Sequence, residues 1–222
     1  MKTIIGGYEQ MKEQQQWEGV LGFWFPEGRS LRIDPAEHRA LWHWRMQGGA
    51  DDAIITRFSS LTEQAANGQL DHWALDPHGR LALITLLDQF SRSVWRESAR
   101  AYAQDMHAMS LVNDGFANGH FASLKTPWFK IVYGLPLGHC EGDDHLQRID
   151  LLINVREKIA AEAPIPLQPI YTSLAHQAAD VRKVIAAFGR HPHRNEVLKR
   201  PSTPSEKAYI AKGEFPHLKA FQ

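Results

Sequence analysis

Apolar residues recur along this chain at the three- and four-residue spacing of α-helices. The pattern predicts helices over residues 8–25, 36–47, 51–67, 77–95, 98–118, 127–135, 144–161 and 170–188, with a last helix starting near 203. No segment alternates apolar and polar residues convincingly, and no hairpin dipeptide lies between two β-branched runs. The pattern therefore predicts an all-α fold of about eight or nine helices.

Several helix ends carry the residues that such ends prefer. Asp34 is placed as an N-cap with Pro35 at the first helical position, and Gly189 stands where a C-cap glycine belongs. The segment 203–206 reads Thr-Pro-Ser-Glu, with Thr203 as N-cap. The only candidate boundary is the proline-rich stretch 164–169, and the segment after it is too short for a core of its own. We therefore expect one all-helical domain over residues 1–222, with 1–16 as a polar N-terminal extension or helix start.

Charge and cysteine content exclude several classes of protein. Lys+Arg and Asp+Glu number 25 each, which argues against nucleic-acid binding and against a polybasic membrane binder. The single cysteine, Cys140, forms no internal disulfide and fits a reducing compartment. There is no apolar signal region and no run of about 18 apolar residues. We expect a soluble, cytoplasmic protein with neither a nucleic acid nor a membrane as partner; a homodimer is compatible with the sequence.

The chain has seven tryptophans, and most of them lie on or beside apolar helix faces. Burial of Trp24, Trp42, Trp44 and Trp95, in the core or around a pocket, is therefore predicted. The position of Trp17 is left open.

A first polar cluster emerges from the most apolar predicted helix. Gln89, Arg92 and Arg96 share one helical face, and the planar guanidinium groups suit a carboxylate or phosphate. The alternative is a structural network in which the arginines pair with Asp88 and Glu97.

A second cluster lies at a helix junction and contains His139, Cys140, Glu141 and His145. His139 and Glu141 are predicted as a general acid–base pair, because histidine titrates near neutrality and a carboxylate can orient it. Two alternatives remain. In one, the polar residues cap the helix that begins near Asp144. In the other, the region from His139 to His145 holds the metal of a metal-dependent enzyme, although the spacing matches no standard metal motif.

The third cluster reads Phe-Gly-Arg-His-Pro-His-Arg-Asn over residues 188–195. Arg190, His193, Arg194 and Asn195 concentrate donors on a loop stiffened by proline, which suits an anion. The alternative is a helix C-terminus whose basic residues complement the helix dipole.

These motifs resemble a known family. The opening Val20-Leu-Gly-Phe-Trp-Phe, the central segment 79–96, the stretch from Tyr133 to Glu141, the loop 188–195 and the segment 202–206 resemble motifs of the bacterial "domain of unknown function 924" family. The resemblance covers about residues 20–213 and implies antiparallel helix pairs in a tetratricopeptide-like or helical-bundle arrangement. It implies no activity.

The chain departs from that family pattern at several positions. Ser91 and Ser93 stand where the family usually has Pro and Asn, Cys140 replaces a serine, and His191 replaces a phenylalanine. The chain therefore resembles a diverged member of that family.

We expect the three clusters to converge, with Arg92 or Arg96 within reach of the 139–141 segment or the 190–195 loop. Converged, they predict a pocket that binds, and in an enzyme transforms, a small anionic or carboxylate-bearing metabolite. His139, Glu141 and His193 are the candidate catalytic residues. The candidate substrate-binding residues are Gln89, Arg92, Arg96, Arg190, Arg194 and Asn195. This hypothesis includes no cofactor and no metal. Besides the metal-dependent enzyme, the alternative is a non-catalytic helical-repeat module that binds a peptide or protein.

Overall fold

The computed structural model describes residues 14–219, and in this part the chain is helical with no strand. The first helix is described over residues 14–24, and most of the expected N-terminal extension, 1–16, lies outside the described residues. The α-helices that follow are α2 (Pro35–Met46), α3 (Asp51–Ala66), α4 (Pro77–Ile84), α5 (Ser91–Val94), α6 (Asp105–Ala117), α7 (His120–Ser123), α8 (Pro127–Tyr133), α9 (Pro136–His139), α10 (His145–Glu162), α11 (Gln168–Phe188), α12 (Pro204–Lys212) and α13 (Pro216–Lys219). The all-α prediction is confirmed.

Three predicted helix ends have the expected geometry. The Asp34 carboxylate accepts hydrogen bonds from the N–H groups of Ala36 and Glu37 at 2.9 and 3.0 Å. Gly189 closes α11 with φ 69°, a left-handed conformation that glycine adopts without strain. Thr203 and Glu206 form a capping box at the start of α12.

Two predicted helices are not regular α-helices over their whole length. The segment 77–95 is helical without a break, but its middle, Thr85–Phe90, is a π-helix between α4 and α5. The hydroxyls of Thr85 and Ser91 donate to main-chain carbonyls four residues earlier, and such bonds favour departures from regular α-helix. The segment 98–118 begins with a 3₁₀ helix, Ala99–Tyr102, before α6. The Arg92 guanidinium donates a hydrogen bond to the Ala101 carbonyl, which is therefore engaged outside the helix.

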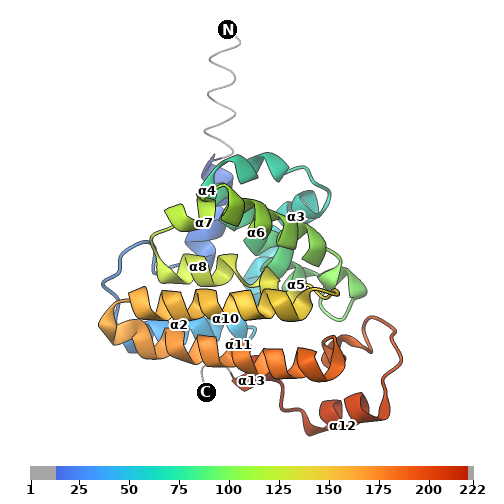
Figure 1. The fold of residues 1–222 in the computed structure, drawn as a ribbon. Coiled ribbons are helices and arrows are strands. Elements are labelled where there is room, and N and C mark those ends of the chain that lie inside the picture. Colours follow the sequence, from blue (N-terminus) through green and yellow to red (C-terminus); the bar gives the residue numbers. More distant parts are fainter. Residues whose placement is uncertain (1–13, 220–222) are drawn as a thin grey trace.

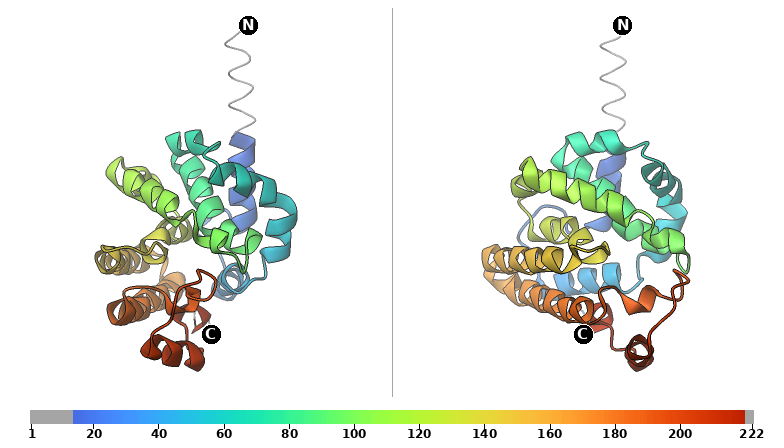
Figure 2. Two further views of the ribbon diagram at one scale, coloured as in Figure 1. Left: turned by 90° about the vertical axis from the view of Figure 1, so that its right-hand side faces the viewer. Right: turned by 45° about the vertical axis from the view of Figure 1, so that its right-hand side comes forward.

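Helices α10 and α11 run antiparallel and side by side along one edge of the molecule (Figure 1). They are joined by the short 3₁₀ helix Ile165–Leu167. The turned views place α12 beyond the C-terminal end of α11 and α13 between α11 and α2 (Figure 2). Gln47, the residue after α2, donates to the His217 carbonyl of α13 at 3.2 Å. This arrangement confirms antiparallel pairing for α10 and α11; a tetratricopeptide-like stack of several such pairs stays a prediction.

The π-helical segment lies in the core, with Leu86, Leu87 and Phe90 fully buried. The tryptophan prediction is confirmed for Trp24 and Trp42, whereas Trp44 and Trp95 are only half-buried. None of the helices in the described part is long and apolar enough to cross a membrane.

Candidate functional site

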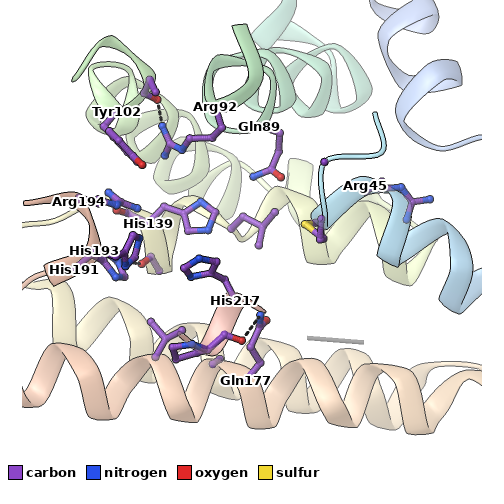
Figure 3. Close-up of a pocket in the computed structure, with 18 of the residues that line it drawn as sticks. Arg45, Gln89, Arg92, Tyr102, His139, Gln177, His191, His193, Arg194 and His217 are labelled. Carbon is purple, nitrogen blue, oxygen red and sulfur yellow. Dashed lines mark hydrogen bonds between the residues drawn. The ribbon is translucent and has the colours of Figure 1, made fainter. Parts of the chain in front are cut away.

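A cavity of about 410 Å³ lies between the α10–α11 pair and the rest of the helices. Its wall takes residues from the first helix, α2, the π-helix, α5, α9, α10, α11, the loop after α11, and α13. Six of the predicted site residues line it: Gln89, Arg92, Arg96, His139, His193 and Arg194. Five of them, without Arg96, appear in the close-up around this space (Figure 3). The clusters therefore converge in space, as expected.

His139 is oriented by a buried carboxylate. Its Nδ1 lies 2.9 and 3.0 Å from the two oxygens of Asp88, which is fully buried on the π-helix. Gln89 also donates to Asp88, and an Arg92 nitrogen lies 3.6 Å from it. Burial alone would raise the pKa of Asp88, but the charge and hydrogen bond of His139, with Arg92 and Gln89, lower it to about 2.

An ionised Asp88 accepts a proton from His139 Nδ1, and in the tautomer that carries its only proton there, Nε2 is the proton acceptor. No hydrogen bond to Nε2 is formed within residues 14–219, and the ring lines the cavity. The arrangement can take a proton from, or return one to, a bound molecule.

Arg92 and Arg194 approach each other through a shared carboxylate and a shared ring. Both donate to Asp105, Arg194 at 3.0 Å. Their guanidinium carbons lie 4.6 and 4.5 Å from the centre of the Tyr102 ring. Arg194 also donates to the His139 carbonyl at 2.9 Å, which ties the third cluster to the second. This side of the cavity therefore combines two guanidinium groups with the oriented imidazole.

Arg96 lies nearer to solvent. It pairs with Asp51, which also accepts a hydrogen bond from Ser93 at 2.6 Å. Its guanidinium is therefore already matched by a carboxylate at the cavity wall.

Glu141, Arg190 and Asn195 lie outside this cavity, and the predicted pairing of His139 with Glu141 is not formed. Glu141 instead pairs with Arg200 and accepts the His191 N–H at 2.8 Å. Arg190 forms a bidentate pair with Glu206, at 2.7 and 3.0 Å. Asn195 bonds to Ser202 and Arg200. Glu141 and Arg190 are satisfied by charges distant in sequence that no local pattern reveals, and Asn195 by neighbours within its own segment. Together these contacts fix the 190–206 segment.

His193 lines the cavity, with its ring centre 4.8 Å from that of His217 on α13. Burial, together with His217, Arg194, His139 and Arg200, lowers the pKa of His193 to about 3. His193 is therefore neutral at pH 7 and offers a hydrogen-bonding ring rather than a charge.

His191 and His145 have a structural role, because each ring bonds to a main-chain carbonyl. Both direct Nε2 to the Gly138 carbonyl at 3.0 Å, and burial lowers the pKa of each. Among the described residues, no group of three or more His, Cys, Asp or Glu is arranged to hold a metal ion. Cys140 is buried, and burial raises the pKa of its thiol, so it is a poor nucleophile.

Sequence reasoning missed Asp105, Tyr102, Arg45 and Arg156 as parts of the site, and it treated Asp88 only as a partner for arginine. Arg156 offered a signal: it stands in the apolar register of α10 with Ile149, Leu152 and Ile159. A charged residue in such a register is buried, and a buried charge needs a partner.

The cavity wall is rich in unpaired donors. Five arginines line it, Arg45, Arg92, Arg96, Arg156 and Arg194, against two acidic residues, Asp51 and Glu97. Buried donor atoms without a hydrogen-bond partner include Trp24 Nε1, Arg45 Nη1, Arg156 Nε and Arg194 Nε. The wall is completed by apolar residues, Ile131, Leu135, Leu152, Leu174, Ala178, Val181 and Val184. This wall suits a molecule with anionic and apolar parts.

Asp88→Asn should lower the free energy of unfolding by about 2 kcal/mol at pH 7. The carboxyl pKa falls from 3.8 to about 2 on folding, so its contribution is complete above about pH 4 and is lost as the pH falls toward 2. Urea unfolding at pH 7 measures the difference. Asp150→Asn, which breaks an ion pair between half-exposed side chains, is the matched control and should change little. Equal effects of the two substitutions would contradict a buried His139–Asp88 pair.

A family model described as "Bacterial protein of unknown function (DUF924)" matches residues 20–214. Among solved structures, a protein of unknown function from Agrobacterium tumefaciens is similar, with 25% sequence identity and a TM-score of 0.65. The similarity covers 90% of this chain and 99% of that chain. No curated protein matches.

Proposed function

The chain belongs to the DUF924 family of bacterial proteins of unknown function, so we propose its function from the cavity: it binds a small anionic metabolite and transfers a proton to or from it. The observation that carries this proposal is His139 on the cavity wall, held by buried Asp88 and flanked by Arg92 and Arg194.

The anionic group is assigned to the side of the cavity formed by Arg92 and Arg194. Both guanidinium groups share one carboxylate, Asp105, and Arg92 also lies 3.6 Å from Asp88, so Arg194 is the one of the two without a carboxylate of its own. Arg194 is buried and its Nε has no partner, and a carboxylate or phosphate oxygen supplies one. The bound anion would therefore supply the acceptor that Arg194 lacks.

The proposed reaction class is proton transfer without a covalent intermediate. His139 Nε2 would act as general base, and Asp88 would stabilise the imidazolium that forms. Of the other residues proposed to contact the ligand, Gln89 and neutral His193 offer hydrogen bonds near the reacting group. Arg96, already paired with Asp51, would contribute hydrogen-bond donors near the solvent side rather than net charge.

The proposal predicts that carboxylates or phosphates raise the melting temperature of the protein, because they bind the folded state. His139→Gln and Arg92→Gln should each weaken binding of the best compound by about tenfold. A thermal-shift screen of organic acids and phosphorylated metabolites, followed by calorimetry, measures this.

Two substitutions outside the cavity serve as controls. In the first, His176→Gln, the replaced histidine lies on the exposed face of α11. The second, Arg100→Gln, removes an arginine that pairs with Glu63 and stacks on Trp95. Both should bind like the wild type. A flat response of the wild-type protein to the whole panel would contradict the proposal and favour the non-catalytic module that binds a peptide.

A further inference from the structure

Arg156 is a buried arginine on α10 that faces α11 across the cavity wall. Only 4% of the residue is exposed. Its Nη1 donates to the Leu174 carbonyl at 2.7 Å and lies 3.3 Å from Gln177 Oε1, while its Nε has no hydrogen-bond partner. The guanidinium is therefore only partly satisfied by the protein.

The other arginines of the cavity each have a carboxylate. Arg45 pairs with Glu27, Arg96 with Asp51, and Arg92 and Arg194 with Asp105. Within residues 14–219, no Asp or Glu pairs with Arg156. Burial lowers its pKa to about 10, so it still carries its charge at pH 7. An unpaired buried charge is costly, and a charge kept in such a place needs an anion from elsewhere.

Arg156 lies apart from the side of the cavity formed by Arg92, Arg194 and His139. Arg148, eight residues earlier on α10, donates to the carbonyl of Cys140, the neighbour of His139. Eight residues of α-helix span about 12 Å. Leu152 lies between Arg148 and Arg156 on the cavity wall, and Leu174 and Ala178 of α11 add to the apolar surface. The cavity thus has a charged side at His139, an apolar middle, and Arg156 beyond it.

From this arrangement we infer that Arg156 is a second anion-binding site, and that the ligand carries two anionic groups joined by an apolar chain, as in a linear dicarboxylate. One group lies against Arg92 and Arg194, as the proposed function requires, and the other takes the unpaired face of Arg156. The apolar chain between them covers Leu152, Leu174 and Ala178.

The test uses Arg156→Met and Arg156→Lys in the full chain, with Arg182→Met as control. Arg182 is half-exposed on α11 and pairs with Asp150. The probes are linear dicarboxylates from succinate to sebacate, the monocarboxylates of the same length, and inorganic sulfate. Calorimetry measures affinity, and melting curves without any probe measure stability.

The wild type and Arg182→Met should bind one dicarboxylate length about tenfold to a hundredfold more tightly than the matching monocarboxylate. Arg156→Met should lose this preference and keep monocarboxylate binding, while Arg156→Lys should retain part of it. Without a probe, Arg156→Met should melt at or above the wild-type temperature, because methionine removes an unpaired buried charge.

Three results would overturn the inference while leaving the proposed function in place. The wild type could bind carboxylates without a preference for dicarboxylates, Arg156→Met could keep the wild-type preference, or Arg156→Met could differ from the wild type only in its affinity for sulfate. A much lower melting temperature of both Arg156 variants would show that Arg156 is needed for folding, and this would also overturn the inference. If the wild type binds no carboxylate at all, the proposed function fails together with the inference.

Discussion

Lowering the pH from 7 to 5 should remove at least about 4 kcal/mol from the free energy of unfolding, a large share of a typical domain's stability. The cause is a set of histidines that fold in the neutral form. Burial, with Arg45 nearby, lowers the pKa of His38 to about 4, and His193 falls to about 3. Burial also lowers the pKa of His145 and, more strongly, of His191.

The sign follows from proton uptake. An unfolded histidine takes up its proton near pH 6.5, whereas these folded ones stay neutral until the pH is much lower. Their contribution to stability is therefore complete above pH 6.5 and is lost as the pH falls toward the folded values. His38 and His193 each lose about 2 kcal/mol by pH 5, and His145 and His191 act in the same direction.

Urea unfolding at pH 7, 6 and 5 measures this loss. His193→Gln should reduce the dependence on pH, because it removes one of the groups that must take up a proton. His176→Gln, on the exposed face of α11, should leave the dependence unchanged. A free energy of unfolding that stays constant from pH 7 to 5 would show that His38 and His193 are hydrated or already charged in the folded protein.

The helices were predictable because their signals are local. A cap such as Asp34 or the Thr203–Glu206 pair acts within four residues, and apolar periodicity needs only one helix. The interruptions were not predictable in the same way. The 3₁₀ segment before α6 depends on Arg92 taking the Ala101 carbonyl, a contact set by tertiary packing.

The site was predictable as a set of residue types but not as a set of pairs. Clusters of arginine and histidine next to apolar helices indicated convergence, and Arg92, His139 and Arg194 do meet. Which carboxylate orients His139 depends on how α9 packs on the π-helix. Asp88, and not the sequence neighbour Glu141, therefore bonds to the His139 ring. Arg45 and Arg156 were missed because each is a single charge in an apolar register rather than part of a cluster.

Asp105→Asn should destabilise the protein by about 3–5 kcal/mol, because two arginines then lose the carboxylate they share. Asp105 is buried, with 6% of the residue exposed, and Arg194 beside it is 5% exposed. Burial and the nearby Arg92 already lower the pKa of Arg194, against the opposing effect of Asp105. Asparagine keeps the size of the side chain but directs an NH₂ group toward one of the two guanidinium groups. The melting temperature should fall by about 6–20 °C for a chain of this size.

The same substitution should increase the response to anions, which separates a ligand site from a purely structural network. With Asp105 neutral, Arg194 loses its carboxylate and Arg92 keeps only Asp88 at 3.6 Å, so the pair presents an uncompensated positive charge to the cavity. Sulfate should therefore raise the melting temperature of Asp105→Asn more than that of the wild type, and more than sodium chloride at equal ionic strength. Asp150→Asn should respond to sulfate like the wild type, since its partner Arg182 lies away from the cavity. An Asp105→Asn variant that is destabilised but gains no response to sulfate would mean that an anion in the cavity cannot reach these arginines, and the proposed binding role of Arg92 and Arg194 would then be wrong.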